Sequence, residues 1–523
     1  MNTCSYTILG GDFDRVGLAA GSLKHRLKKL GVPPDALRRA VIAAYEAEAN
    51  IVVHAGKGML RAVLEPSRID VEVTDEGPGI PDIDLAMKEG FSTASPAARA
   101  LGFGAGMGLP NMKRNSGSFS IESDLQRGTR IRFSIDLPRQ EIVGTLRNSV
   151  RIAGELCRGC MRCLNACPTR AMRIRPEGPE ILTHLCIDCA ACIDACDAGA
   201  VGIADNIDVP TQSEHALLVV PASFLVDFGP VVEPHQVLDA LSTMGFRGIR
   251  MIEEWEAATR QAVLAYAREE AEIRPVLSPV CPAVVNLIQM RFPSLLPHVA
   301  PFLSAVEAVR EDLAGERVFL GVSCPAQHTL VNTGRSSSTP VPLMLSRLRG
   351  AVFSAAIRHR DTATGPPRQP GPEERAGPDV LQASGLRHVL NILDKAENGL
   401  LADFVLLELL ACEQGCFGSP AGGEEPFIAR HRWQRVRRDL VRPAKAFRRK
   451  TPLVARAGMR LDDDMSRAVE KLLEIDRLTA DLPGKNCGMC GAPACSDLAE
   501  DLVLGRAQGM VCPHRADGQE KSR

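Results

Sequence analysis

Two runs of cysteines, CRGCMRCLNACP and CIDCAACIDACD, repeat the spacing CxxCxxCxxxC. Soft thiolate ligands on so short a loop suit an iron–sulfur cluster, and three of them reach three corners of one cubane. Zinc is the alternative, but a structural zinc ion takes four ligands and leaves this pattern of eight unexplained. The chain has 17 cysteines and no apparent secretory signal, so we expect reduced thiols that bind metal rather than disulfides.

The double run resembles the bacterial two-cluster ferredoxin, in which the last cysteine of each run completes the cluster that the other run holds. The resemblance implies a ferredoxin domain at residues 146–206. It also implies two [4Fe-4S] clusters, one on Cys157, Cys160, Cys163 and Cys196, and the other on Cys186, Cys189, Cys192 and Cys167.

A third group of cysteines stands near the end of the chain, in NCGMCGAPACSDLAEDLVLGRAQGMVCP. Its tight CxxCGxxxC loop leads into a predicted helix, and a distant cysteine closes the site. The pattern resembles the small iron–sulfur domain of electron-transfer and carbon-monoxide-dehydrogenase-type proteins, which implies a small helical domain at residues 479–515. The implied [4Fe-4S] ligands are Cys487, Cys490, Cys495 and Cys512. A zinc knuckle is the alternative for this group.

Four of the five remaining cysteines follow predicted strands, and these are Cys281, Cys324, Cys412 and Cys416. The strands VLSPV, VFLGV and VLLELL are apolar, and an α/β domain places its ligands beyond the carboxyl ends of such strands. A lone cysteine in an apolar run, as Cys281 is, also occurs as a small buried side chain that fills a core. The spacing alone leaves both interpretations of Cys281 open.

These cysteines lie in three motifs that resemble those of the catalytic domain of [FeFe]-hydrogenases. The family motifs TSCCP, MPCxAKK and ExMACxxGC correspond here to SPVCP (278–282), VSCPAQH (322–328) and ELLACEQGC (408–416). The resemblance implies an α/β hydrogenase-like domain, placed at residues 213–450, in which the four cysteines hold a further [4Fe-4S] cluster. Cys281 then becomes a ligand whose partners lie far away in sequence.

The departures from that family concern the residues around its diiron subcluster. Val280 stands where the family has a cysteine that relays protons, and an isopropyl group carries no proton. Gln327 replaces the lysine that holds a cyanide of the subcluster, and Leu330 replaces the glutamate that follows it. We therefore expect the cubane without the diiron centre, and no hydrogenase activity.

Residues 1–140 contain no cluster motif but combine a polar helix face with glycine-rich turns. The segment ALRRAVIAAYEAEANIVVHA (36–55) has helical apolar spacing, which places Glu46 and Asn50 on one face. Three further boxes follow in order, DEGPGI (75–80), GFGAGMGLPNM (102–112) and GTRIRF (128–133). The set resembles the ATP-binding domain shared by histidine kinases and anti-sigma-factor serine kinases, which is an α/β sandwich. The EAxxN spacing is nearer to that of the anti-sigma kinases.

The resemblance to those kinases assigns a role to each box. It implies that Glu46 polarises an attacking hydroxyl group or water, and that Asn50 holds Mg²⁺ against the phosphates of ATP. Asp75 accepts a hydrogen bond from the adenine amino group, and Thr129 closes the adenine pocket. Five glycines let the backbone approach the base and the phosphates: Gly77, Gly79, Gly104, Gly106 and Gly108. An ATP-binding fold that no longer hydrolyses ATP is the alternative, since a fold does not fix an activity.

The bulk composition sets the remaining expectations. With 523 residues the chain has room for roughly three to four domains. A net charge of -1 attracts neither nucleic acid nor membranes, and no run of about 20 apolar residues predicts a transmembrane helix. The segment RHRWQRVRRDLVRPAKAFRRK (430–450) is basic; it could touch nucleic acid, but we favour a helix that covers the hydrogenase-like domain or docks an acidic partner. We expect a cytoplasmic protein.

The predicted architecture is multidomain α/β and α+β, with four [4Fe-4S] clusters and one site for ATP with Mg²⁺. The leading hypothesis is a redox- or H₂-linked regulatory protein, in which the state of the clusters is coupled to ATP binding or to serine/threonine phosphorylation of a partner protein. An ATP-gated electron-transfer oxidoreductase is the alternative, and an active [FeFe]-hydrogenase is a third hypothesis. Because only a short link joins Leu137 to Cys157, we expect the ferredoxin clusters to lie nearest to the ATP site.

Overall fold

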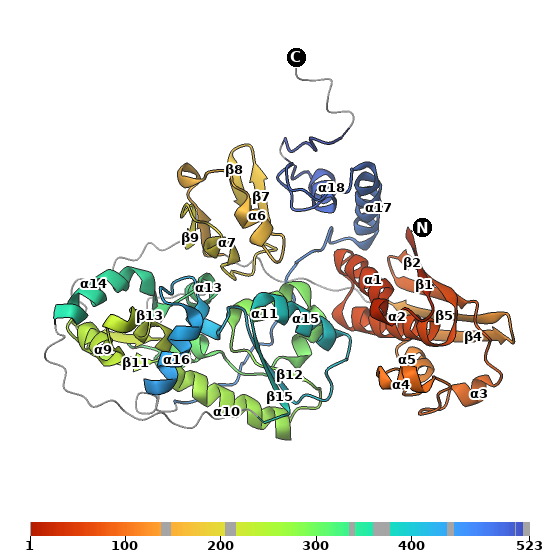
Figure 1. Cartoon of the computed structure of the whole chain (residues 1–523), viewed down its shortest axis with the longest axis horizontal. Helices are drawn as coiled ribbons and strands as arrows, with labels where there is room; N and C mark the ends of the chain where they lie inside the picture. Colours follow the sequence, from red (N-terminus) through yellow and green to blue (C-terminus); the bar gives the residue numbers. More distant parts are fainter. Residues whose placement is uncertain are drawn as a thin grey trace, which may run out of the picture.

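The computed structural model describes residues 2–137, 148–203, 216–333, 340–358, 377–436, 444–507 and 509–515. Within these ranges the chain forms the mixed α/β and α+β architecture that the sequence predicts, with several separate sheets (Figure 1). The predicted domain boundaries at residues 140, 146, 206 and 213 fall outside the described residues. None of the described helices is long and apolar enough to cross a membrane.

The N-terminal domain is a sandwich of one antiparallel sheet and one layer of helices. Its strands lie in the order β1-β2-β3-β5-β4. Their bounds are β1 (Asn2–Leu9), β2 (Lys57–Glu65), β3 (Arg68–Asp75), β4 (Ser118–Asp124) and β5 (Gly128–Asp136). The helical elements are η1 (Phe13–Arg15), α1 (Leu18–Lys29), α2 (Pro34–His54), α3 (Ile83–Ala86), α4 (Pro96–Ala100) and α5 (Gly108–Arg114).

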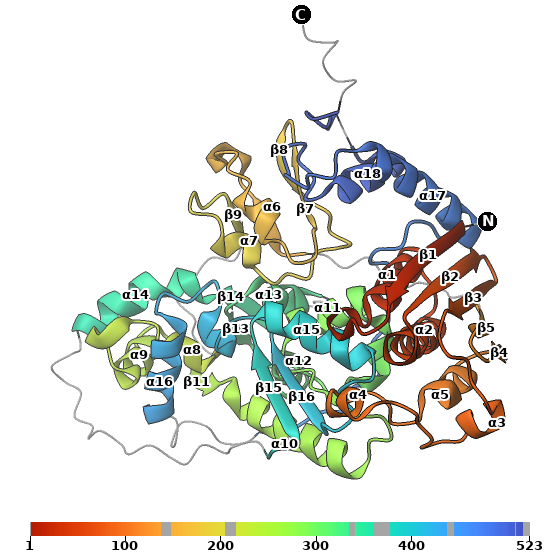
Figure 2. The ribbon, with the colours of Figure 1, turned by 45° about the vertical axis from the view of Figure 1, so that its right-hand side comes forward.

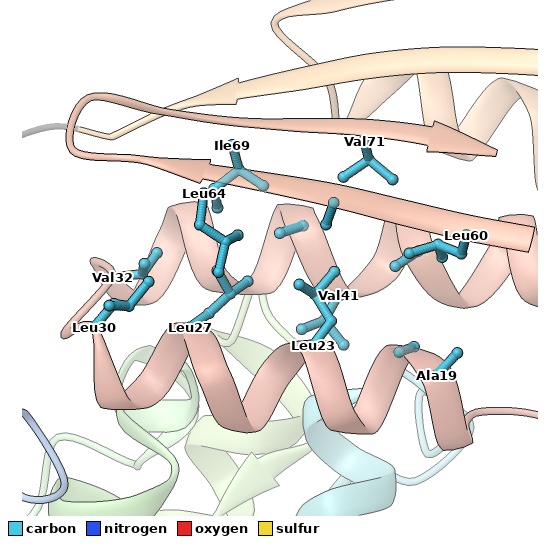
Figure 3. Close-up of a cluster of buried hydrophobic side chains, with 14 of the residues drawn as sticks. Ala19, Leu23, Leu27, Leu30, Val32, Val41, Leu60, Leu64, Ile69 and Val71 are labelled. Atoms are coloured by element: carbon cyan, nitrogen blue, oxygen red, sulfur yellow. The ribbon is translucent and has the colours of Figure 1, made fainter. Parts of the chain in front are cut away.

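Alternation of apolar and polar residues decides which face of this sheet the helices cover. In β2, Leu60 and Leu64 are buried whereas Met59, which points the other way, is exposed. Leu23 and Leu27 of α1 are fully buried in the same core, between α2 and the sheet (Figure 3). Each such leucine contributes about 1.5–3 kcal/mol to folding, so α1 is an integral layer of the domain rather than an appendage.

The ferredoxin-like domain consists of two short strand pairs and two helices that carry the cysteine runs. Strands β6 (Val150–Ile152) and β9 (Val201–Ile203) pair with each other, as do β7 (Met172–Arg175) and β8 (Gly178–Ile181). The helical elements are η2 (Gly154–Leu156), α6 (Arg162–Ala166) and α7 (Ala191–Asp194). Met161 and Ala190 precede the two helices with φ of 59° and 69°, so the two halves repeat one local conformation.

The hydrogenase-like domain is built on two parallel sheets, β11-β10-β13-β14 and β12-β16-β15. The strands are β10 (Leu217–Val220), β11 (Gly248–Met251), β12 (Val276–Leu277), β13 (Val318–Val322), β14 (Val341–Met344), β15 (Val380–Ser384) and β16 (Leu406–Leu410). The helical elements are α8 (Ala222–Leu225), η3 (Gly229–Val231), α9 (Pro234–Ser242), α10 (Glu253–Glu269), α11 (Pro282–Arg291), η4 (Pro293–His298), α12 (Ala305–Asp312), α13 (Pro325–Asn332), α14 (Leu345–Arg358), α15 (Leu386–Glu397), η6 (Gly415–Gly418) and α16 (Pro426–Val436).

The C-terminal iron–sulfur-type domain is helical and packs on the N-terminal domain. It contains α17 (Met465–Asp481) and α18 (Cys495–Val503). Helix α17 lies beside α1 and β2, and α18 lies between α17 and the strands β7 and β8 (Figure 2). Leu472 and Leu498 of these helices belong to the same continuous hydrophobic core as Leu27 of α1. Residues at opposite ends of the chain therefore form one packed unit.

A second continuous core joins the ferredoxin-like domain to the hydrogenase-like domain. Ile187, which lies within the second cysteine run, is buried together with Leu277 at the end of β12 and Val284 in α11. Partly buried cysteines from both domains pack against this core, among them Cys189 and Cys324. The two domains thus share an apolar interior at the place where their cysteines meet.

Candidate nucleotide and iron–sulfur sites

The polar face of α2 lies against the glycine-rich turn that opens α5. A Cβ added at Gly108 would stand 3.1 Å from Asn50 Oδ1 and 3.3 Å from Glu46 Oε2. Asn111, one turn further along α5, donates a hydrogen bond of 2.7 Å from Nδ2 to Glu46 Oε1. The structure therefore brings together Glu46, Asn50 and Gly108, which the sequence analysis proposes for the phosphate end of the nucleotide.

Asp75 is the last residue of β3, and the backbone holds its carboxylate in place. Its Oδ1 accepts hydrogen bonds from the N–H of Gly77 at 2.8 Å and of Thr129 at 3.3 Å. Burial raises the pKa of Asp75 above its usual value, and these two donors and His54 offset only part of that rise. Thr129 is buried and exchanges a hydrogen bond of 2.9 Å with Ser123, so the predicted adenine-pocket residues are adjacent.

Two of the predicted glycines occupy positions that no other residue fits. Gly79 has φ of +77°, and a Cβ there would lie 2.3 Å from the carbonyl oxygen of Asp124. Gly106 has φ of +74° and would place a Cβ 2.4 Å from the backbone of Gly90, to which its own carbonyl is hydrogen-bonded. Gly104 precedes it in the same turn, also at positive φ. The fold itself thus requires these glycines, with or without nucleotide.

The residues present fit ATP with Mg²⁺. Asp75 offers a half-buried carboxylate for the base, and Asn50 offers an amide oxygen for the metal ion at the phosphates. Glycine-rich turns lie near both residues. Asn50 would hold the metal ion, Asp75 would hold the base, and backbone N–H groups of the turn would contact the phosphates. The roles of all these residues, including that of Glu46, stay predictions.

The sequence analysis missed a buried carboxylate on α2 that contacts α1. Glu48 is 2% exposed and accepts hydrogen bonds from the N–H of Ala19 at 3.1 Å and of Ala20 at 2.9 Å. These N–H groups lie in the first turn of α1 and have no acceptor within that helix, so they need one from elsewhere. The signal was present, because an acidic residue stands among alanines on the apolar face of the predicted helix.

The cysteines of the ferredoxin-like domain come together in the crossed arrangement of the sequence pattern. Burial, followed by the neighbouring thiol of Cys167 and with a contribution from Cys163, raises the pKa of the Cys192 thiol to about 12. Cys186 and Cys189 have raised pKa values for the same reasons, burial first and then, among other neighbours, Cys167. The last cysteine of the first run therefore stands among the first three of the second run.

The first run lies nearer to the surface. Burial raises the pKa of Cys163, and Cys157 and Cys160 add to the effect. Cys160 is exposed, and Cys196 packs on the same small core as Cys163. Electrons that enter this domain would reach the cluster predicted at these four cysteines first.

The four cysteines of the hydrogenase-like domain also converge, and Cys281 is one of them. Burial raises the pKa of Cys324 to about 12, with a further contribution from Cys281. The pKa of Cys416 is raised by burial, then by the Glu256 carboxylate, and then by Cys324, Cys281 and Cys412. Three of these cysteines immediately follow β12, β13 and β16 or their next turn, as expected for ligands at the carboxyl ends of parallel strands. Their assignment as cluster ligands stays a prediction.

Gln327 and Val280 stand beside this tetrad, where the hydrogenase family holds its diiron group. Gln327 is 6% exposed, and its Oε1 accepts a hydrogen bond of 2.9 Å from the N–H of Ser323. Its Nε2 points toward Cys416 Sγ at 3.9 Å. The side chain therefore contacts both the local turn and the thiol, and the absence of a diiron group stays a prediction.

The four cysteines of the terminal domain line one small hollow. Its walls also include Leu498, Lys485 and His514, and the Lys485 Nζ lies 3.3 Å from His514 Nδ1. In the described part of the chain, no three or more His, Cys, Asp or Glu side chains converge as a single metal ion needs. A cubane binds each of four thiolates through a different iron, so the four thiols around this hollow fit one, and a zinc knuckle stays the alternative.

The four cysteine groups form a series in space. Cys163 of the first ferredoxin group neighbours Cys192 of the second, and Cys189 of the second neighbours Cys412 of the hydrogenase-like group. The terminal group adjoins the ferredoxin-like domain through a hydrogen bond of 2.9 Å from Ile174 N to Gly491 O. Clusters at these positions would supply one-electron transfer from domain to domain.

The described part of the basic segment 430–450 covers the hydrogenase-like domain. Arg449 binds Glu307 through two hydrogen bonds of 2.8 and 2.7 Å, and Lys450 lies 3.0 Å from Glu311. Residues 437–443 lie outside the described ranges. These ion pairs support the interpretation as a covering segment.

Models of four protein families match separate parts of the chain. They are the Histidine kinase-, DNA gyrase B-, and HSP90-like ATPase at residues 35–139 and the 4Fe-4S dicluster domain at 156–201. The Iron only hydrogenase large subunit, C-terminal domain, matches residues 215–310, and a Putative Fe-S cluster model matches 482–514. The matches follow the order of domains that the sequence predicts.

Curated relatives match the N-terminal domain. The serine/threonine-protein kinase RsbT of Bacillus subtilis (strain 168) is 36% identical over 108 residues, which are 20% of this chain and 75% of RsbT. The Anti-sigma F factor of Caldanaerobacter subterraneus subsp. tengcongensis is 32% identical over 100 residues, 19% of this chain and 62% of that factor. The chain thus spans less than two thirds of the anti-sigma factor.

Among solved structures, a variant of apo [FeFe]-hydrogenase HydA1 from Chlamydomonas reinhardtii aligns at 14% identity. The alignment covers 51% of this chain and 91% of that chain with a TM-score of 0.33, which is too low to support a conclusion. The family of the N-terminal domain follows from its family model and from its identity to RsbT. The chain belongs, through its N-terminal domain, to the histidine kinase-, DNA gyrase B- and HSP90-like ATPase family, and it joins that domain to iron–sulfur and iron-only-hydrogenase-like domains.

Proposed function

We propose that this is a regulatory protein in which the redox state of iron–sulfur clusters sets the affinity for ATP or the serine/threonine phosphorylation of a partner protein. RsbT is named a serine/threonine-protein kinase, and the other relatives are anti-sigma F factors. Their names support ATP use and a protein partner for the N-terminal domain. The attached iron–sulfur domains support a redox or H₂-linked signal as the input. ATP, Mg²⁺ and four [4Fe-4S] clusters are the proposed cofactors.

The observation that carries the proposal is the position of α1. At its start, Glu48 of α2 ties it to the helix that carries Glu46 and Asn50. Further along, Lys24 and Lys28 bind Glu397 of the hydrogenase-like domain at 2.6 and 2.8 Å. One helix therefore contacts both the nucleotide-site helix and an iron–sulfur domain, as coupling between two sites requires.

A second candidate, ATP-gated electron transfer, is favoured by the series of cysteine groups. The series runs from the exposed Cys160 to the partly buried Cys281. In that case the nucleotide would control passage of electrons rather than respond to them. Reduced protein would then pass electrons to a one-electron acceptor faster with Mg-ATP than without it.

The test compares ATP affinity in the oxidised protein and in dithionite-reduced protein by anaerobic calorimetry. Coupled sites typically change each other's affinity by about 5- to 150-fold, so we expect dissociation constants that differ within that range. The Asn50→Ala variant controls for binding outside the proposed site. Equal affinities in both states, together with ATP-dependent electron transfer, would contradict the proposal and favour the second candidate.

A further inference from the structure

Helix α18 joins three parts of the molecule. It begins at Cys495, one of the four cysteines that line the terminal hollow. Five residues later Glu500 Oε2 lies 2.7 Å from Lys29 Nζ, at the end of α1 in the N-terminal domain. The next residue, Asp501, is 0% exposed and binds Arg173 and Arg175 of the ferredoxin-like domain.

The contact between Lys29 and Glu500 is largely removed from water. The two side chains are 10% and 12% exposed. Around them, Leu27 and Leu30 of α1 belong to the same core as Leu498 of α18 and as Cys512, the last cysteine of the terminal group. An ion pair in such surroundings is screened much less than a surface pair, so a nearby change of charge alters its strength.

The ferredoxin-like cysteines have no comparable link with the N-terminal domain in the described residues, whose hydrophobic core continues into the terminal domain instead. This differs from the expectation that the short connection after Leu137 brings the ferredoxin pair closest to the ATP site. Packing of α17 and α18 decides the neighbour, and sequence distance does not. Figure 2 shows α17 beside α1 and the sheet, and α18 next to α17.

We infer that the redox state of the terminal four-cysteine site controls the ATP affinity of the N-terminal domain, through the contact of Glu500 on α18 with Lys29 on α1. The inference rests on the proposed function and names the route by which that coupling runs. At the other end of α1, the N–H groups of Ala19 and Ala20 donate hydrogen bonds to Glu48, which lies two residues from both Glu46 and Asn50 in the sequence. A shift of α1 is thereby passed to the nucleotide-site helix.

The redox step is a transfer of one electron. A low-potential one-electron carrier is oxidised and the group held by the terminal cysteines is reduced, with no bond made or broken and no proton required. The added negative charge lies at the Cys495 end of α18, roughly 7.5 Å along the helix from Glu500. It repels the Glu500 carboxylate and attracts the Lys29 ammonium group, so the balance of forces on the end of α1 differs between the two states.

The experiment measures ATP dissociation constants, oxidised and reduced, for four anaerobic proteins. They are the native chain, Glu500→Gln, the charge swap Lys29→Glu with Glu500→Lys, and Glu397→Gln, which alters the ionic contact of α1 with the hydrogenase-like domain. Iron content and the electron paramagnetic resonance of the ferredoxin-type clusters report whether each variant keeps its clusters. In a fifth protein, Cys487→Ser, an exposed ligand of the terminal site is removed.

We expect the redox difference of about 5- to 150-fold to fall below twofold in Glu500→Gln and in Cys487→Ser. The difference should persist in Glu397→Gln and return at least in part in the charge swap. If Glu500→Gln loses iron, the charge swap decides the test instead. A full difference retained in Glu500→Gln or Cys487→Ser would overturn this inference alone. Equal affinities in the native chain would overturn the proposed function and this inference with it.

Discussion

Lys24 of α1 and Glu397 of α15 form a buried ion pair between the ATP-binding and hydrogenase-like domains, with 2.6 Å between Nζ and Oε2. Lys28 joins the same carboxylate at 2.8 Å, so two ammonium groups share one acidic partner. Burial alone would raise the pKa of Glu397, but the two lysines outweigh it and lower the pKa below its usual value. Burial lowers the pKa of Lys28 to about 8. The two domains are thus joined by buried charges that would lose these partners if the domains separated.

Replacing Glu397 by alanine should be strongly destabilising. Removal of one member of a buried ion pair typically costs about 3–5 kcal/mol, because the partner charge stays buried. Lys28 would lose its carboxylate partner, whereas Lys24 would keep Asp394 at 3.0 Å, so we expect a loss near the lower end of that range. We expect a clearly lower urea midpoint in anaerobic unfolding of Glu397→Ala. The exposed Glu474 of α17 provides the matched control, since a surface change of this kind stays within about 0.5 kcal/mol. A loss of less than 1 kcal/mol for Glu397→Ala would show that the interface tolerates unpaired lysines.

The contact between the ferredoxin-like and terminal domains should weaken in mild acid through His184. Its Nε2 lies 3.2 Å from Arg506 Nη1, and burial, followed by Arg506, lowers its pKa to about 4. In the unfolded chain the pKa is about 6.5, so only the unfolded state takes up this proton between those values. The stabilisation is therefore complete above pH 6.5 and is lost as the pH falls toward 4.

The measurement for His184 is the urea midpoint at pH 7 and pH 5. The native protein should lose on the order of 2 kcal/mol more than His184→Gln over this range. Substitution of the exposed His431 by glutamine is the control. Parallel pH dependences of the native protein and His184→Gln would mean that His184 is not the group responsible.

Cys281→Ser should remove one cluster and leave the others. Its thiol stands with Cys324, Cys412 and Cys416, so its loss should lower the iron content by about four atoms per chain. The ferredoxin-type electron paramagnetic resonance should be unchanged. Cys4→Ser is the control, because Cys4 lies in β1 away from these groups. An unchanged iron content would return Cys281 to the role of a small apolar side chain.

The nucleotide site should separate into a metal-binding and a base-binding end. Asn50→Ala should abolish Mg²⁺-dependent ATP binding, and Asp75→Asn should weaken binding even without Mg²⁺. Glu46→Ala should retain binding but lose any phosphoryl transfer. Calorimetry with and without Mg²⁺ distinguishes these cases. Tight binding in both Asn50→Ala and Asp75→Asn would place ATP elsewhere.

Motif spacing was sufficient to predict the domains, because cysteine pairs and glycine boxes are local. The structure brings Glu46, Asn50 and Gly108 together, as the motifs suggested, and the roles of these residues stay predictions. Local spacing does not report which surfaces meet. The partnership of Lys29 with Glu500 joins residues that are 471 positions apart, and nothing in either neighbourhood marks it.

Buried polar residues were missed for a related reason. Glu48 stands on the apolar face of its predicted helix, but the sequence does not show which donors satisfy it there, and the same holds for the partners of Asp501. A pattern of apolar spacing predicts the buried face of a helix but not the partner that allows a charge to be buried there. The docking of domains therefore had to come from the structure.

The central claim is that the clusters and the ATP site are coupled, and binding couplings are reciprocal. The most direct measurement is a redox titration of the iron–sulfur signals with and without saturating Mg-ATP. A coupling of about 5- to 150-fold corresponds to a shift of roughly 40–130 mV in the midpoint of one cluster, and the shift should be absent in Asn50→Ala. Midpoints that are the same with and without Mg-ATP in the native protein would contradict the account.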